Sequence, residues 1–186
     1  MLSDKKRTGK EVKNYNNNKN VMSVYKITLC GLMTALAMVF SYIENLIPIP
    51  IPVYGIKLGV ANIAIIGMLY SIGWKEAMIV NVLRITLTAM MFGNLNSFLF
   101  SIAGGMLSIL VMIILKSLKI FSQIGVSIAG GVSHNIGQII AAMLIMETPA
   151  IIYYLPVLMI AGIIAGVITG IVGKILSDTI TKTINK

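Results

Sequence analysis

The stretch LNSFLFSIAGGMLSILVMIIL, residues 95–115, carries no charged side chain over its whole length. A helix that crosses the hydrocarbon core of a bilayer needs about 20 apolar residues. The stretch therefore predicts a membrane-spanning helix. The rest of the chain has the same character, because 57% of its 186 residues are hydrophobic and only 11% are charged. This composition is far from that of a soluble domain and indicates one polytopic membrane domain.

Five further apolar runs flank this stretch, two of them short for a full span. They cover residues 27–47, 58–72, 77–92, 124–146 and 150–176. The polar break Gly73–Glu76 separates the two short runs, 58–72 and 77–92, so six spans are predicted rather than five. We expect an all-α bundle of six transmembrane helices over residues 27–177. A disordered basic cytoplasmic tail at 1–26 would precede it, and a short cytoplasmic tail at 178–186 would follow.

The distribution of Lys and Arg predicts the orientation of this bundle. With the N-terminus inside, thirteen of these residues fall on the cytoplasmic side, only Lys57 falls outside, and Arg84 lies within a helix. Cytoplasmic loops carry such an excess, so both termini are expected in the cytoplasm. The net charge of +9 does not indicate nucleic-acid binding, because the basic residues flank apolar segments.

The outer connection Pro48–Gly55 contains alternating prolines (PIPIPVYG). Proline lacks a backbone donor and biases the preceding residue to extended conformations, so this segment cannot be a regular helix. It is either a stiff connector or a lid over an outward-facing site.

Polar side chains inside the apolar runs collect in the outer half of the predicted bundle. Ionisable groups at membrane depth cost several kcal/mol unless they face a cavity or a partner. Asn81, Arg84 and Thr88 share one helix face, and Gly130, His134 and Gln138 share another. This asymmetry predicts one pocket that opens outward, with Arg84, His134 and Glu44 among its walls.

Each of these residues also has a purely structural interpretation. Arg84 could pair with Glu44 or extend towards the membrane surface. His134 could be a core histidine bonded to a helix carbonyl, and Asn135 and Gln138 could simply hydrogen-bond between helices. The last two polar positions, Tyr153 and Tyr154, suit an aromatic belt as well as a ligand contact.

Small residues recur at four-residue spacing, as in Gly162, Gly166 and Gly170 or in Gly31 and Ala35. Such faces let helices approach closely. They serve either internal packing or the docking of a partner subunit.

The residues for common enzyme chemistry are missing from the sequence. Asp4 and Asp178 are the only aspartates, and there is one cysteine and one histidine, so aspartate-rich magnesium motifs and the usual zinc sets cannot be built. A Walker ATP-binding loop is also absent. We therefore expect no catalytic activity and no cofactor, whereas coupling to an ion gradient through Glu44 and His134 stays open.

Three motifs carry a family resemblance. They are ENLIPIPIPVYGIKLGVAN at 44–62, RITLTAMMFGNLNSFL at 84–99 and SHNIGQ at 133–138. Together they resemble the bacterial Gx transporter family, which is also labelled heptaprenyl diphosphate synthase component I, and the likeness covers residues 25–177.

That family is similar in size and layout to the substrate-binding S components of energy-coupling factor transporters. The resemblance implies a six-helix protein of the bacterial cytoplasmic membrane that binds a vitamin-like ligand from outside. It also implies a separate transmembrane subunit with two ATPases, which would meet Gly31 and Ala35. The loop Pro48–Gly55 would then cover the ligand.

The favoured hypothesis is a binding subunit for the uptake of a small, anionic or vitamin-like molecule. The expected ligand-binding residues are Arg84, His134, Asn135, Gln138, Glu44, Asn62, Lys57, Asn81 and Asn96. Arg84 would engage the anionic group, and the amides and His134 would give directional hydrogen bonds. The alternative is a membrane accessory subunit of isoprenoid or quinone biosynthesis or of an electron-transfer assembly.

Overall fold

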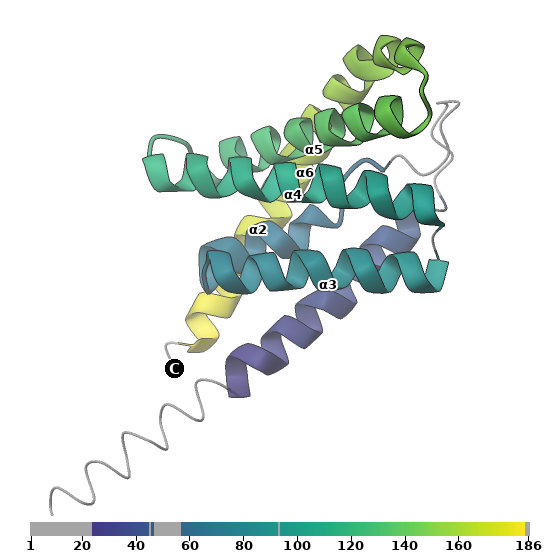
Figure 1. The fold of residues 1–186 in the computed structure, drawn as a ribbon. Coiled ribbons are helices and arrows are strands. Elements are labelled where there is room, and N and C mark those ends of the chain that lie inside the picture. Colours follow the sequence, from purple (N-terminus) through teal and green to yellow (C-terminus); the bar gives the residue numbers. More distant parts are fainter. Residues whose placement is uncertain (1–23, 45, 47–56, 93, 185–186) are drawn as a thin grey trace, which may run out of the picture.

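The computed structural model describes residues 24–44, 46, 57–92 and 94–184, and this part of the chain contains helices and no strands (Figure 1). The elements are an N-terminal helix Val24–Glu44, α2 (Asn62–Ser71), α3 (Trp74–Phe92), α4 (Leu95–Leu118), α5 (Gln123–Ile145), the 3₁₀-helix η1 (Pro149–Tyr154) and α6 (Leu155–Ile184). The all-helical fold predicted from the sequence is confirmed for these residues.

Among the described residues, four helical segments are long and apolar enough to cross a membrane. They are the N-terminal helix, α4, α5 and the continuous segment Pro149–Ile184. With ten residues, α2 is about 15 Å long, half the thickness of a hydrocarbon core. The run 58–72 was expected to be helical throughout, and this is wrong, because Leu58–Ala61 lies outside the helix. Six full spans stay a prediction.

Polar side chains cap the N-terminal ends of α4 and α5. The Asn94 side chain accepts a 2.8 Å hydrogen bond from the backbone N–H of Ser97, and the Ser122 hydroxyl accepts one of 3.2 Å from Gly125. Such caps satisfy backbone donors that a helix leaves free at its start. At the other end of the chain, α6 continues to Ile184, so the segment predicted as a C-terminal tail is helical up to that residue.

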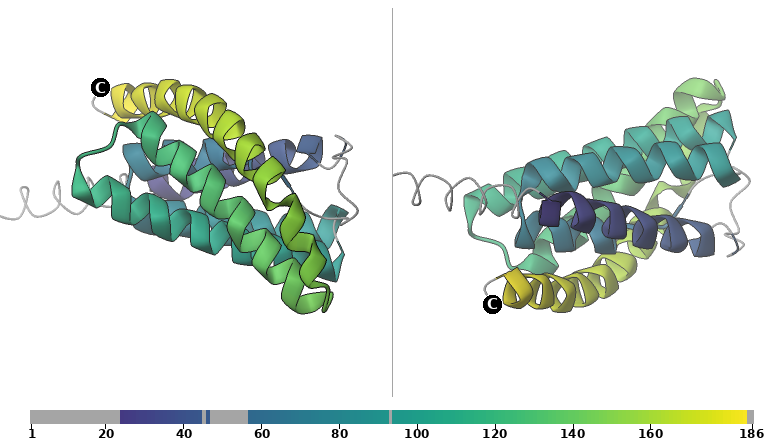
Figure 2. Two further views of the ribbon diagram at one scale, coloured as in Figure 1. Left: turned by 90° about the horizontal axis from the view of Figure 1, so that it is seen from above. Right: turned by 90° about the horizontal axis from the view of Figure 1, so that it is seen from below.

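The helices form a bundle in which α4 packs on α5, α5 on α6, and α6 on α2. Figures 1 and 2 show α6 as a long, curved helix that crosses behind α5 and α2. The close approach of α5 and α6 depends on glycine, since a Cβ atom on Gly131 would lie 2.5 Å from the carbonyl oxygen of Gly162. The glycines of α6 therefore serve packing within this chain.

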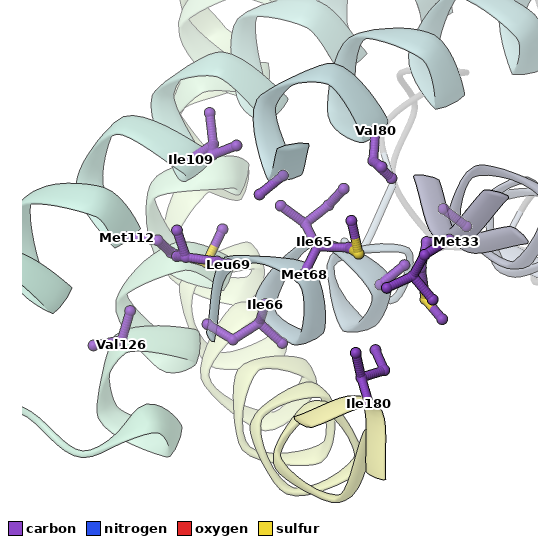
Figure 3. Packing of buried hydrophobic residues seen from close by; sticks show 14 residues of the cluster. Met33, Ile65, Ile66, Met68, Leu69, Val80, Ile109, Met112, Val126 and Ile180 are labelled. Atoms are coloured by element: carbon purple, nitrogen blue, oxygen red, sulfur yellow. The ribbon is translucent and has the colours of Figure 1, made fainter. Parts of the chain in front are cut away.

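Short as it is, α2 forms the centre of the main apolar core. Every residue from Asn62 to Leu69 is buried. Figure 3 shows its side chains between those of the neighbouring helices, including Met33, Val80, Met112 and Ile180. A helix that is apolar all round is typical of a buried position. The surrounding helices thus cover α2 on all sides with apolar side chains.

Described residues satisfy two backbone carbonyls near the C-terminal end of α2. The carbonyl of Met68 accepts from Ile72 and Gly73, at 3.0 and 3.1 Å. The ammonium of Lys116, on α4, donates to the carbonyl of Leu69 and lies 4.8 Å from the ring centre of Tyr70. A cation at this place also interacts favourably with the helix dipole.

A second, smaller apolar cluster lies around Phe100, Ile139 and Leu158. Along α5, Val126 belongs to the main core and Ile139 to this second cluster. The polar residues of α5, at 134–138, fall between the two.

Candidate functional site

The structure gathers most of the polar residues predicted for the site around the short segment Lys57–Ala61. We call this group the polar cluster: Glu44, Lys57, Asn62, Asn81, Arg84, His134, Asn135 and Gln138. All eight are buried, with 0–6% of their surface exposed. They come from the N-terminal helix, the segment itself, α2, α3 and α5, so five parts of the chain meet here.

Arg84 lies at the centre of this cluster and is bound only to neutral amides among the described residues. Its Nε and one terminal nitrogen donate to the Asn81 side-chain oxygen at 3.2 and 3.0 Å, and that nitrogen also reaches Asn62 at 3.4 Å. Asn81 in turn donates to the Gly105 carbonyl at 3.0 Å. With 2% exposed, Arg84 does not extend towards the membrane surface.

The bridge between Arg84 and Glu44, the structural alternative considered from the sequence, is not formed. Within the described part of the chain the one ion pair joins Lys26 and Glu76, at 3.1 Å. The Glu44 carboxylate instead accepts a 2.5 Å hydrogen bond from the backbone N–H of Val60 through Oε1. Glu44 thus holds the segment Lys57–Ala61 against the N-terminal helix, and its second oxygen has no described partner.

Gln138 holds the same segment from the opposite side. It accepts from the backbone N–H of Lys57 at 2.9 Å and donates to the Lys57 carbonyl at 2.7 Å. Asn135 donates to the Leu158 carbonyl on α6 at 2.6 Å and accepts a 3.3 Å bond from Gln138. Both amides are therefore occupied in linking elements of the fold, the structural alternative considered from the sequence.

Gly59 allows the segment to fold closely over α2 and α5. Its φ of +88° lies in the left-handed region that favours glycine. A Cβ here would lie 3.1 Å from the Asn62 amide nitrogen and 3.2 Å from the His134 ring. The backbone of Gly59 thus covers His134 at a distance that a larger residue would not permit.

Five buried polar atoms of this region have no hydrogen-bond partner among the described residues. They are Glu44 Oε2, Asn62 Nδ2, Thr88 Oγ1, Ser101 Oγ and His134 Nδ1. An unpaired buried polar group costs roughly 1–3 kcal/mol, so such groups are normally satisfied by protein, water or ligand. Their concentration in one region indicates a place where a polar molecule or ordered water completes the bonding.

Thr88 and Ser101 lie near Arg84 by the pairing of α3 with α4. The bond from Asn81 to Gly105 sets that pairing. Thr88 lies two turns beyond Asn81 on α3, and Ser101 lies one turn before Gly105 on α4, both towards the connection between these helices. The sequence placed Thr88 on the same face as Arg84 but did not predict Ser101 as a site residue. The four-residue spacing of the small residues Ser97, Ser101 and Gly105 on α4 could have pointed to Ser101.

The model of one protein family, heptaprenyl diphosphate synthase component I, matches residues 33–176. The chain belongs to this family. No curated protein and no solved structure matches it. The matched residues include every member of the polar cluster, so the cluster lies within the region that the family model describes.

The charges of the polar cluster do not balance. Lys57 and Arg84 carry positive charge, Glu44 carries the one negative charge, and the buried group is therefore cationic when these residues are ionised. Arg has a planar fork of donors that matches carboxylate and phosphate. The cluster is thus suited to an anionic group.

Several residues predicted to have a functional role lie away from the cluster. Asn96 is exposed on the first turn of α4, and Tyr153 is 81% exposed. Gly31 and Ala35 are exposed on the N-terminal helix, and open space surrounds Gly31. The outer loop Pro48–Gly55 lies outside the described residues. Within the described ranges, no three His, Cys, Asp or Glu residues could hold a metal ion together.

Proposed function

We propose that this chain is a membrane-embedded binding subunit for the uptake of a small anionic molecule. The observation that carries the proposal is the buried guanidinium of Arg84, which has neutral amides as its described partners. A buried cation is expensive unless it is paired. A ligand carboxylate or phosphate would supply the missing negative charge.

The roles of the other residues follow from their contacts. Asn62, Thr88, Ser101 and His134 each have an unpaired polar atom that a bound molecule would satisfy. Lys57 adds a second buried positive charge to the polar cluster. Gln138 and Glu44 would act through the backbone segment that they position. Asn81 would act by holding Arg84, and Asn135 by linking α5 to α6.

The wider arrangement belongs to the same proposal. The chain would cross the bacterial cytoplasmic membrane six times, with both termini in the cytoplasm, in the manner of an S component. It would have no catalytic activity of its own and would need a coupling subunit with ATPases. The exposed surface around Gly31 and Ala35 supports such a contact on the N-terminal helix.

A thermal-shift screen of the purified protein tests the binding role. Vitamins, quinone precursors and inorganic phosphate would be added to the wild type, to Arg84→Gln and to Lys182→Gln. Lys182 is exposed in the last turn of α6 and serves as a matched control for lost charge. We expect an anionic compound to raise the unfolding temperature of the wild type and the control, but not of Arg84→Gln. Equal stabilisation of all three would remove Arg84 from the site.

The family description favours a second candidate, a membrane accessory subunit of prenyl diphosphate synthesis. Co-purification from native membranes distinguishes the two roles. A transmembrane subunit with ATPases would support uptake, whereas a soluble prenyl synthase or redox proteins would support the accessory role.

A further inference from the structure

An apolar groove of about 250 Å³ lies between the segment Lys57–Ala61 and α6. The segment contributes Leu58 and Val60, and the helix contributes Ala161, Ile164, Ala165 and Ile168. Ile164 and Ile168 are each more than half exposed on the outer surface of α6. In a membrane this side of the helix would face lipid, so the groove would open sideways into the bilayer.

The lining of the groove has no free polar group. Its one polar residue, Thr169, is bonded to the Ser127 hydroxyl at 2.7 Å and to the Gly166 carbonyl at 3.2 Å. A ligand with polar groups would gain no hydrogen bond here and would lose those it makes with water. The groove is therefore suited to hydrocarbon.

The same backbone segment borders both the groove and the polar cluster. The Val60 side chain lines the groove while its N–H binds Glu44. Lys57 is bonded to Gln138, and Gly59 lies against His134. An apolar surface and a buried cationic group thus share a few residues of one backbone segment.

We infer that the molecule bound by this chain is an anionic amphiphile, with its headgroup at the polar cluster and its hydrocarbon chain in the groove. This inference rests on the proposed function and names the class of its ligand. Charge complementarity distinguishes this occupant from a zwitterionic bilayer lipid, because the cluster carries two cations and one carboxylate. The guanidinium of Arg84 suits a phosphate or a carboxylate equally.

The test compares long and short anions of the same headgroup. The protein would be placed in nanodiscs of zwitterionic lipid, and affinities measured for farnesyl phosphate, methyl phosphate, palmitate and acetate. The variants are Ala161→Trp, which fills the groove, Ile175→Trp, which places the same ring on an exposed part of α6, and Arg84→Gln. The phosphate and carboxylate pairs show which headgroup is preferred.

We expect at least one long-chain anion to bind ten times or more tightly than its short partner, because apolar surface buried in the groove adds to affinity. Ala161→Trp should remove that advantage and leave the short anion unchanged. Ile175→Trp should match the wild type, and Arg84→Gln should weaken long and short anions alike. In the wild type alone, affinity should rise with chain length and then level off once the groove is filled.

Each other outcome has a distinct meaning. If long and short anions bind equally, or Ala161→Trp behaves like Ile175→Trp, the amphiphile inference is wrong although anion binding stands. If affinity keeps rising with hydrocarbon length in every variant without levelling off, the hydrocarbon chains insert into the bilayer rather than into the groove. If no anion binds in this assay or in the thermal-shift screen, the proposed function itself is wrong.

Discussion

The two ends of α2 are built in opposite ways. At its C-terminal end, described residues satisfy the carbonyls of Gly67, Met68 and Leu69, and apolar side chains surround the helix. At its N-terminal end, Asn62 lies among buried charges and has an unpaired amide nitrogen. One ten-residue helix thus has several carbonyls hydrogen-bonded by described residues at one end and an unpaired buried amide at the other.

This difference distinguishes residues that stabilise the fold from residues that are retained although they lower its stability. Natural proteins retain unsatisfied or strained groups where function requires them. Mutations at the C-terminal end should therefore lower stability alone. Mutations of the unpaired groups at the other end should change binding while costing little stability, and four substitutions test this contrast.

The largest loss is expected for Ile65→Ala. Ile65 is fully buried in the main core, and removing such a side chain costs about 2–5 kcal/mol through lost burial and the cavity that remains. Unfolding in detergent by a chemical denaturant would measure the change. Ile175→Ala, at a 63% exposed position, is the control and should cost far less. Equal losses would show that α2 is not the centre of the core.

Gln138→Leu should cost about 1–3 kcal/mol, because it leaves the buried backbone N–H and C=O of Lys57 unpaired. Hydrogen exchange should become faster at Lys57–Gly59 and stay unchanged in α4. Asn96→Leu removes an exposed amide and should alter neither measurement. Unchanged exchange at Lys57 would mean that Gln138 does not hold the segment.

Lys116→Met should cost on the order of 1 kcal/mol, because it removes the cation from the C-terminal end of α2. Lys119→Met, nearby and exposed, provides the control. Ligand binding should be the same in both variants and in the wild type. A specific loss of binding in Lys116→Met would contradict the division between the two ends of α2.

The smallest change in stability is expected for Thr88→Val, within about 0.5 kcal/mol of the wild type, because this hydroxyl has no described partner to lose. Thr169→Val should cost more, about 1–2 kcal/mol, since it leaves the bonded hydroxyl of Ser127 unpaired. If Thr88 contacts the ligand, its variant should bind less tightly despite its normal unfolding temperature. A large destabilisation would show that the hydroxyl already has a structural partner.

The sequence predicted the helical class, because the apolar runs carry it, and residue spacing placed Arg84 with Asn81 on one helix face and His134 with Gln138 on another. It could not predict the short α2. Residues 58–72 form one mostly apolar run with no break at Ala61, and the backbone of Lys57–Val60 is directed by Glu44 and Gln138, which are distant in sequence. The same long-range contacts decide the amide partners. From the sequence, Gln138 suited a ligand as well as the backbone of Lys57.

The shortness of α2 has an electrostatic consequence. A helix has about half an elementary positive charge at its N-terminus, and a helix that crosses the whole bilayer leaves it in the headgroup region. Here the helix begins at Asn62, against the middle of α3, and Ala61 before it provides no side-chain cap. The positive partial charge at the start of α2 is thereby placed inside the bundle, beside Arg84. The low dielectric constant there strengthens its attraction for an anion.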